Sequence, residues 1–246
     1  MKDDINNNNG FYKDLDSNFK LACELSEQSY THDKLLNMLK TGNIPQKQIA
    51  ALNFDYVSDR NDAEVLLNNL VGCDGKIREA VALKINTLIS ADEKVRKIFA
   101  DFSSDIFAKA TVDINANICR LVVDSAVLLK NYTSFANSYS EKIINQINDA
   151  LSELDKFIFR DKKYVINKQL FKLYWCLEAL ADFYPYVQED ILYTIIKKCT
   201  YQSEYTIREK TAQILIKSGK FNDIKDVLKN DENYYVRQML HHPRFL

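Results

Sequence analysis

The stretch Gly75-Lys76-Ile77-Arg78-Glu79-Ala80 recurs in degraded form at four later places in the chain. Good copies are Tyr205-Thr206-Ile207-Arg208 and Tyr234-Tyr235-Val236-Arg237, and weaker ones are Asn117-Ile118-Cys119-Arg120 and Val165-Ile166-Asn167-Lys168. Each copy follows a polar turn and begins a pattern of apolar residues spaced three and four apart, as on one face of a helix. Such a phrase, repeated at a regular spacing, predicts a stack of helix pairs.

The spacing between the copies separates a repeat from mere helicity. The aliphatic residues of successive copies lie 41, 48, 41 and 29 residues apart, and Ile49 is the equivalent position 28 residues before the first copy. The central values fall in or beside the roughly 40–47-residue period of HEAT and armadillo arrays. Shorter repeats are expected at the ends, because one face of a terminal repeat meets water rather than a neighbour.

A family resemblance follows from these residues. Asp74–Ala80 resembles the second-helix signature of HEAT repeats, in which Asp is followed by an aliphatic residue, Arg and a small residue. Asn233–Arg237, with His242-Pro243 after it, resembles the shorter leucine-rich-variant helical repeats. The resemblance covers roughly residues 33–246 and implies an all-α fold, a right-handed α-solenoid of stacked antiparallel HEAT-like or armadillo-like helix pairs.

The composition agrees with a helical chain. Among 246 residues there are only five glycines and three prolines, fewer than the turns of an all-β or α/β domain require. The formal net charge of -1 provides no general attraction for a polyanion. Residues 1–15 are acidic and Asn-rich and are expected to form a disordered tail, and residues 16–246 are expected to form a single domain.

The cysteines and the apolar runs indicate the compartment. Five cysteines are scattered without a CxxC pair, which is typical of reduced thiols in a cytosolic protein. Cys119 and Cys176 lie within apolar helical patterns and are expected in the core. No run approaches the roughly 18 apolar residues that cross a bilayer. The sequence therefore predicts a cytoplasmic protein without membrane insertion.

The resemblance also implies a role for the arginine of the phrase. In HEAT repeats the equivalent arginine pairs with the turn aspartate of its own or a neighbouring repeat. The candidate donors of this latch are Arg78, Arg208 and Arg237, and the candidate acceptors are Asp74, Glu204 and Asp231. Because partly exposed pairs contribute only about 0–1 kcal/mol each, the latch would fix register. A ligand-facing role for the arginines is the alternative.

Motifs that carry catalysis are absent from the sequence. The three histidines are His32, His241 and His242, and no HExxH or zinc-type Cys/His spacing occurs. A solvated or capping role is expected for the last two. No Gly-rich phosphate loop and no GxSxG is present. The chain is therefore predicted to be no enzyme and to hold no metal or cofactor. HEAT-like di-iron hydroxylases use His-Glu pairs, and this chain has no His-Glu dipeptide.

The aromatic stretch from Phe171 to Tyr186 is the oddest local feature and includes the single tryptophan, Trp175. One interpretation places Tyr174, Leu177, Ala181 and Tyr184 in a helical core. The other is a partly exposed aromatic anchor, of the kind that dominates binding energy at interfaces. The candidate protein-binding residues are Arg120, Asp124, Lys168, Lys172 and Trp175.

Two functions follow from this pattern. The preferred prediction is a non-enzymatic scaffold or adaptor that binds another protein on the concave face lined by second helices. The alternative is a nucleic-acid-binding or DNA-repair protein, because HEAT-like alkylpurine DNA glycosylases use aromatics and an Asp, here Trp175 and Asp182, in a basic groove. The basic residues available are Arg78, Lys84, Arg120, Lys168, Lys172 and Arg208. The interspersed acids weaken such a groove; they are Glu79, Asp124, Glu178 and Glu209. The sequence leaves open the partner and whether residues 131–163 interrupt the array.

Overall fold

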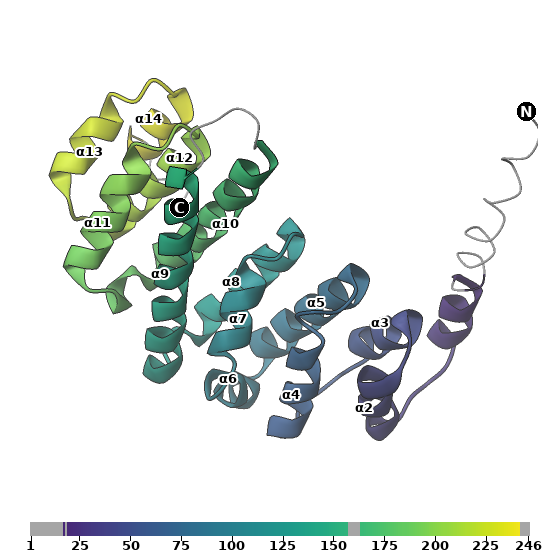
Figure 1. The fold of residues 1–246 in the computed structure, drawn as a ribbon. Coiled ribbons are helices and arrows are strands. Elements are labelled where there is room, and N and C mark those ends of the chain that lie inside the picture. The colour runs from purple at the N-terminus through teal and green to yellow at the C-terminus, as the bar shows by residue number, and fades with distance from the viewer. Residues whose placement is uncertain (1–16, 18, 157–162, 242–246) are drawn as a thin grey trace, which may run out of the picture. The chain divides into compact units, whose positions relative to one another are not determined.

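The computed structural model describes residues 17, 19–156 and 163–241 and divides the chain into two compact units at Val95/Arg96. Over the described residues, all regular structure is helical and no strand occurs (Figure 1), which confirms the all-α prediction. The predicted tail at residues 1–15 lies outside the described residues. One continuous array over residues 16–246 stays a prediction, and each unit is described by itself.

Unit 1 contains two stacked helix pairs after a short helix at 19–26. Its helices are α2 (His32–Thr41), α3 (Ile44–Leu52), α4 (Arg60–Asn68) and α5 (Gly75–Ala91). Helix α2 packs on α3 and α4 packs on α5, while α3 contacts α5 and α2 contacts α4, so the pairs form two layers. Helix α6 (Glu93–Ala100) spans the division between the units.

Unit 2 contains four further helix pairs in two layers. The first layer consists of α7 (Ser104–Thr111), α9 (Thr133–Lys156), α11 (Glu189–Thr200) and α13 (Asn222–Lys229). The second-helix layer consists of α8 (Ala116–Leu129), α10 (Lys163–Phe183), α12 (Tyr205–Ser218) and α14 (Tyr234–His241). Helix α10 packs on α9 and lies between α8 and α12, and α14 packs on α12. The second layer therefore runs α8–α10–α12–α14.

The described residues of the region around 131–163 belong to the stack, as parts of α9 and α10. Helix α9 is one continuous helix of 24 residues and α10 has 21, whereas α8 and α12 each have 14. The extra turns in this pair account for the longer spacing of 48 residues between two copies of the phrase. They also carry the first turns of α10 past the starts of its neighbours in the layer.

The repeated phrase begins four of the second helices in the same way. An oxygen-bearing cap accepts a hydrogen bond from the backbone N–H two residues later, as Asp74 does from Lys76 at 2.9 Å and Asn233 does from Tyr235 at 2.9 Å. Asn115 and Glu204 cap α8 and α12 in the same manner. Three residues after each cap the aliphatic side chain is buried; these side chains are Ile77, Ile118, Ile207 and Val236.

The next residue of the phrase bonds back to the preceding turn. Arg78 Nη1 donates to the Cys73 carbonyl, Arg237 Nη1 donates to the Glu232 carbonyl at 2.9 Å, and Arg208 Nη1 donates to the Ser203 carbonyl at 3.0 Å. In α8 this position holds Cys119, whose thiol reaches the Asp113 carbonyl at 3.1 Å. The phrase thus fastens these four second helices to their own turns, and cysteine takes the place of arginine in α8.

Aromatic side chains fill the core of unit 2. Phe135 stacks on Tyr139 with ring centroids 5.5 Å apart, and Tyr139 lies 4.9 Å from Phe183. The buried Tyr139 hydroxyl is 2.7 Å from Thr111 Oγ1, so neither hydroxyl is left without a partner. Phe183, the last residue of α10, is buried in this core. The chain then continues in a 3-10 turn, η2 (Tyr184–Tyr186).

The core interpretation of the aromatic stretch was right for two residues and wrong for two. Leu177 and Ala181 are fully buried, but Tyr174 and Tyr184 are only half-buried. Tyr184 leaves the helical face at the end of α10 and donates its hydroxyl to the Lys217 carbonyl at 2.9 Å. Tyr174 lies at the edge of the exposed side, where it contacts Trp175.

Candidate protein-binding surface

Helix α10 presents one side to the core and another to the outer side of its layer. Its buried residues recur at helical spacing and include Leu173, Cys176, Leu177, Leu180 and Phe183. A second set at spacings of four, three and four stays half-buried; this α10 stripe consists of Phe171, Trp175, Glu178 and Asp182. Because α10 lies between α8 and α12, the stripe is the centre of the exposed side of the second-helix layer.

The N-terminal half of the stripe is aromatic and borders a pocket. The Trp175 ring meets Phe171 at 6.3 Å and Tyr174 at 5.3 Å between centroids, in both cases edge to face. The pocket is open and has a volume of about 400 Å³. It is lined by Ala116, Asn167, Leu170, Phe171, Tyr174, Trp175, Glu204 and Thr206, and we call it the aromatic pocket.

Its position follows from the unequal helix lengths. Ala116 begins α8, and Glu204 caps α12, so the pocket lies where the long α10 passes the N-terminal ends of its two shorter neighbours. The indole N–H of Trp175 is buried and has no acceptor among the residues that the structure describes. A buried donor without an acceptor costs about 1–3 kcal/mol, so this group would gain from an acceptor supplied by a ligand.

The C-terminal half of the stripe is charged and neutralised from both sides. Lys217 Nζ lies 3.0 Å from Asp182 and Lys130 Nζ lies 3.8 Å from the same carboxylate. Lys210 pairs with Glu178, and its Nζ lies 5.0 Å from the centroid of the Tyr174 ring. Burial lowers the pKa of Lys210, but the Glu178 carboxylate, together with Tyr174, outweighs burial and leaves the pKa above its ordinary value. Glu178 and Asp182 thus already have cationic partners.

Two predicted binding residues, Arg120 and Asp124, lie one turn apart on α8, and both are exposed. The pKa of Asp124 is raised, chiefly by partial desolvation; Arg120 opposes the rise, while the carboxylates of Glu178 and Asp182 add to it. This coupling places Asp124 within electrostatic reach of the α10 stripe. Asp124 and Arg120 therefore lie on the exposed side of the helix that packs beside α10.

Lys168 and Lys172, also predicted, lie one turn apart at the start of α10, beside the aromatic pocket. Lys168 is exposed and Lys172 is half-buried. Over the described ranges, neither ammonium has a carboxylate within 4.0 Å, in contrast to Lys130, Lys210 and Lys217. The basic residues at this end of the surface thus remain without an ion-pair partner in that part of the chain.

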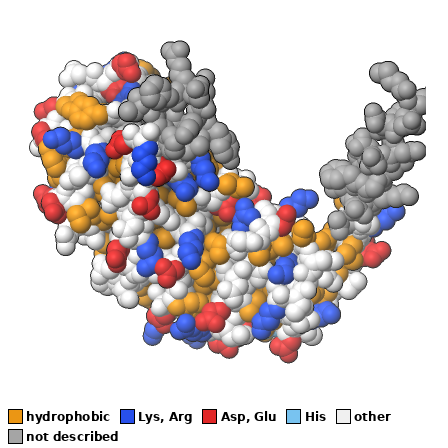
Figure 2. Space-filling view, in the orientation of Figure 1, with side chains coloured by type: hydrophobic (Ala, Val, Ile, Leu, Met, Phe, Trp, Pro, Cys, Tyr) orange, Lys and Arg blue, Asp and Glu red, His pale blue; other side chains and the backbone are white. Residues whose placement is uncertain are grey.

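Sequence reasoning missed the lysines that hold the stripe in place. Lys210 and Lys217 come from α12 and are 32 and 35 residues away from their partners Glu178 and Asp182 on α10. Predicting these pairs requires knowing how the two helices are aligned. The stripe itself could have been found from the sequence, because Phe171, Trp175 and Glu178 lie at positions i, i+4 and i+7 and so share one face of a helix. On the face of unit 2 seen in Figure 2, basic and acidic side chains are interspersed with hydrophobic side chains.

The latch candidates lie elsewhere and bond within the stack. Arg208 is buried and donates to both carboxylate oxygens of Asp231, the turn residue of the next pair. Asp74 and Glu204 act as helix caps. Arg208 therefore does not face the surface on which a ligand could bind.

Unit 1 holds a polar cluster around the buried Asp62. Its Oδ2 accepts hydrogen bonds from Ser58 N–H at 2.9 Å and Ser58 Oγ at 2.6 Å and lies 3.0 Å from His32 Nε2. The His32 ring stacks on Tyr56 at 4.3 Å between centroids. Burial raises the pKa of Asp62, but the hydrogen bonds from Ser58 and the nearby His32 together lower it by more than burial raises it. The pKa therefore lies below its usual value. Since serine and histidine both bond to the carboxylate, the cluster ties α2 to α4 and does not form a nucleophile–base pair.

Other chemistry has little support in the described part of the chain. No group of three or more His, Cys, Asp or Glu side chains suited to a metal ion occurs among the described residues. No helix in those ranges combines the length and apolarity needed to cross a bilayer. His241 is exposed at the end of α14, and His242 lies outside the described residues.

No protein-family model and no curated protein matches the chain. Among solved structures, it is similar to the crystal structure of an engineered protein of the Northeast Structural Genomics Consortium. That match has 11% sequence identity and a TM-score of 0.51 and covers 87% of this chain and 96% of the other. A second engineered protein from the same consortium matches with 10% identity and a TM-score of 0.46, covering 87% and 94%. At 11% identity the first likeness supports the all-helical fold alone.

Proposed function

We propose that this protein is a HEAT-like, right-handed helical-repeat array that acts as a non-enzymatic cytoplasmic scaffold or adaptor. The binding surface is the exposed side of the second-helix layer in unit 2, centred on the α10 stripe. The observation that supports it is the half-buried Trp175 beside the aromatic pocket, on a layer whose neighbouring charges are fixed by ion pairs. Aromatic anchors in partly desolvated pockets of this kind carry much of the energy of protein interfaces.

The arrangement of charges favours binding over catalysis. A catalytic acid or base needs a free proton site that faces a substrate. On this surface the Glu178 and Asp182 carboxylates are neutralised by lysines, which instead makes them rigid. A fixed surface of aromatic and paired polar groups loses little conformational entropy when a partner binds.

The nucleic-acid alternative has weaker support. Asp182, the acid expected for a repair site, is paired with two lysines, and Arg208 is buried against Asp231. A groove that follows phosphates needs a continuous row of cations, whereas acids alternate with bases along these helices. We therefore rank protein binding first.

Photo-crosslinking tests the proposal. A photoreactive p-benzoylphenylalanine at Phe171 should give a discrete protein adduct in the native cells, and Trp175→Ala should abolish that adduct. The matched control is the same group at Tyr201, which is also in unit 2 and is 70% exposed at the end of α11. Equal adducts at both positions, or none at Phe171, would contradict the proposal. A duplex DNA complex that weakens steeply with salt would favour the alternative.

A further inference from the structure

We propose that the aromatic pocket receives the large apolar side chain of an acidic peptide segment, one in which a Phe or Leu is flanked by Asp and Glu. This inference rests on the proposed function, because it names the chemistry of the partner for the same surface. It follows from the lining of the pocket and from the distribution of paired and unpaired charges around it.

The lining selects an apolar anchor. Leu170, Phe171, Tyr174 and Trp175 supply one wall from α10, and Ala116 borders it from α8. The volume of about 400 Å³ lies near the lower end of the roughly 300–1,000 Å³ found for small-ligand sites. It therefore suits one large side chain with the adjoining backbone. Asn167 and Thr206 on the rim offer polar groups to that backbone.

The Trp175 indole adds a reason for a peptide. Its N–H is buried without an acceptor among the described residues. A carbonyl of an extended peptide lying beside the ring would supply that acceptor after a small rotation of the side chain. Indole N–H groups at interfaces commonly find such a partner, since one edge of the ring is polar and the rest is apolar.

The charges around the pocket select an acidic flank. Lys168 and Lys172 have no ion-pair partner among the described residues, and Arg120 is exposed on the neighbouring helix α8. The acid on the pocket rim, Glu204, is engaged as a helix cap and accepts from the backbone N–H and the hydroxyl of Thr206 at 3.5 and 3.3 Å. Complementary charges at an interface set specificity and raise the association rate.

A basic peptide would find fewer free partners. Of the acids near the stripe, Glu178 is paired with Lys210, and Asp182 is paired with Lys217 and lies near Lys130. Asp124 remains, with Arg120 acting on it. Binding a cationic segment would therefore require the existing ion pairs to break, whereas an acidic one uses the lysines at the start of α10.

The test is direct because Trp175 is the single tryptophan of the chain, so the tryptophan emission reports on this pocket. The probes are blocked hexapeptides without tryptophan: Asp-Glu-Asp-Phe-Asp-Glu, the same peptide with Ala for Phe, and Lys-Arg-Lys-Phe-Lys-Arg. The acidic Phe peptide should shift the Trp175 emission in a saturable way. The Ala peptide should bind about tenfold more weakly, because a buried aromatic anchor dominates such interfaces. The basic peptide should bind at least as weakly.

Charge reversal tests the acidic flank separately. Lys168→Glu with Lys172→Glu should weaken binding of the acidic peptide about tenfold. The binding that remains should no longer weaken as the salt concentration rises, because the electrostatic attraction has been removed. Lys197→Glu with Lys198→Glu is the control, as both lysines are exposed on α11 in the same unit and the charge change is equal. It should alter affinity less than about twofold. Circular dichroism verifies that both variants are folded, and Lys172→Glu alone provides a milder second variant.

The outcomes separate the inference from the proposed function. Stronger binding of the basic peptide, no dependence on the Phe anchor, or equal loss in both double variants would overturn the acidic-peptide proposal. A discrete adduct at Phe171, combined with any of these results, leaves protein binding in place and removes only the inferred chemistry. Saturable, Phe-dependent binding that is lost only in the Lys168/Lys172 variant supports it.

Discussion

Arg208 donates two hydrogen bonds to the Asp231 carboxylate, from Nε to Oδ2 at 2.7 Å and from Nη2 to Oδ1 at 3.0 Å, across 23 residues of sequence. The two side chains are only 8% and 6% exposed. The pair joins α12 to the turn that begins α14, and the remaining Arg208 nitrogen bonds to the carbonyls of Gln202 and Ser203. It is the most complete copy of the latch.

Removal of this arginine should destabilise unit 2. Arg208→Met leaves Asp231 buried without its partner, which costs about 3–5 kcal/mol in comparable buried pairs. Urea unfolding followed by Trp175 fluorescence measures the change within unit 2. The control is Lys229→Met, which breaks an exposed pair with Asp226 and should cost at most about 0.5 kcal/mol. Equal losses in the two variants would show that the buried pair has no special role.

The same pair predicts sensitivity to acid. Burial raises the pKa of Asp231, but the hydrogen bonds from Arg208 and from the Asn233 N–H lower it by more than burial raises it. The folded-state pKa therefore lies below the reference value of 3.8. The unfolded chain therefore binds a proton more readily. The contribution of Asp231 to stability is present above pH 3.8 and is lost as the pH falls through the lower, folded pKa. Stability measured from pH 3 to pH 6 should fall on acidification, and Asp231→Asn should flatten that fall.

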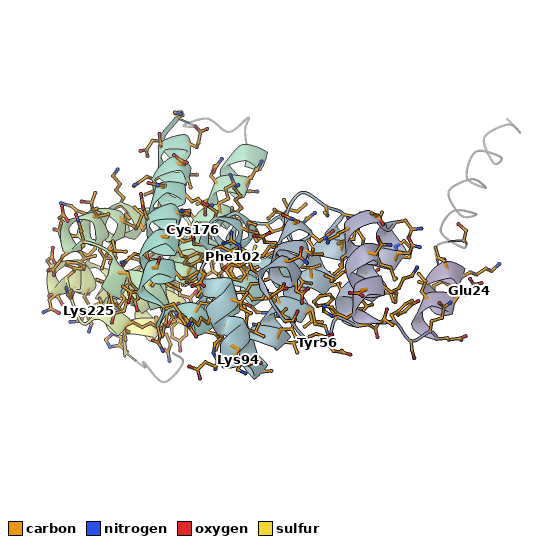
Figure 3. All side chains as sticks on the ribbon, turned by 90° about the horizontal axis from the view of Figure 1, so that it is seen from below. Glu24, Tyr56, Lys94, Phe102, Cys176 and Lys225 are labelled. Carbon is orange, nitrogen blue, oxygen red and sulfur yellow. The ribbon has the colours of Figure 1, made fainter. Side chains whose placement is uncertain are left out.

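The five cysteines should divide into two classes of reactivity. Burial raises the pKa of the Cys119 and Cys199 thiols to about 12 and raises that of Cys176 as well. Cys176 lies among the helices of unit 2 (Figure 3). Because the thiolate is the reactive form, these three should be inert to a disulfide reagent at pH 8, whereas the exposed Cys23 and half-buried Cys73 should react. Mass spectrometry after partial labelling identifies the sites; rapid labelling of Cys119 would contradict its burial.

The buried hydroxyl pair in unit 2 should behave as a coupled unit. Thr111→Val leaves the Tyr139 hydroxyl without its 2.7 Å partner and should cost about 1–3 kcal/mol. Tyr139→Phe should cost about 1 kcal/mol, and the double variant should lose less than the sum, since no orphaned hydroxyl remains. A double-mutant cycle on the free energy of unfolding measures the coupling. Strict additivity would mean that the two hydroxyls do not depend on each other.

The helix starts were the most predictable part of the fold. Ile77, Ile118, Ile207 and Val236 are buried near the beginning of second helices because a local cap and a local spacing determine them. The fate of Tyr174 and Tyr184 was not predictable in the same way. It depends on where α10 ends and on which side of the helix the neighbours lie, and neither is encoded within one helical period.

The residue types of the candidate surface can be chosen from the sequence, but their ion pairs cannot. Trp175, Lys168 and Lys172 were predicted because they lie in the aromatic stretch and among the basic residues of the second helices, near a weak copy of the phrase. The partners of Glu178 and Asp182 could not be predicted, because they come from other helices and depend on how those helices are aligned. The division at Val95 likewise arises from packing between helices and leaves no mark in the composition.

The contact between the Cys119 thiol and the Asp113 carbonyl bears on how such chains diverge. In four copies of the phrase, the residue after the buried aliphatic one also donates to a backbone carbonyl of its own turn, which no substitution removes. The donor is therefore free to change from guanidinium to thiol while the helix keeps its place. A repeat of this kind can lose its recognisable letters long before it loses its shape, so ancestry among such proteins is better traced through conserved geometry than through conserved residues.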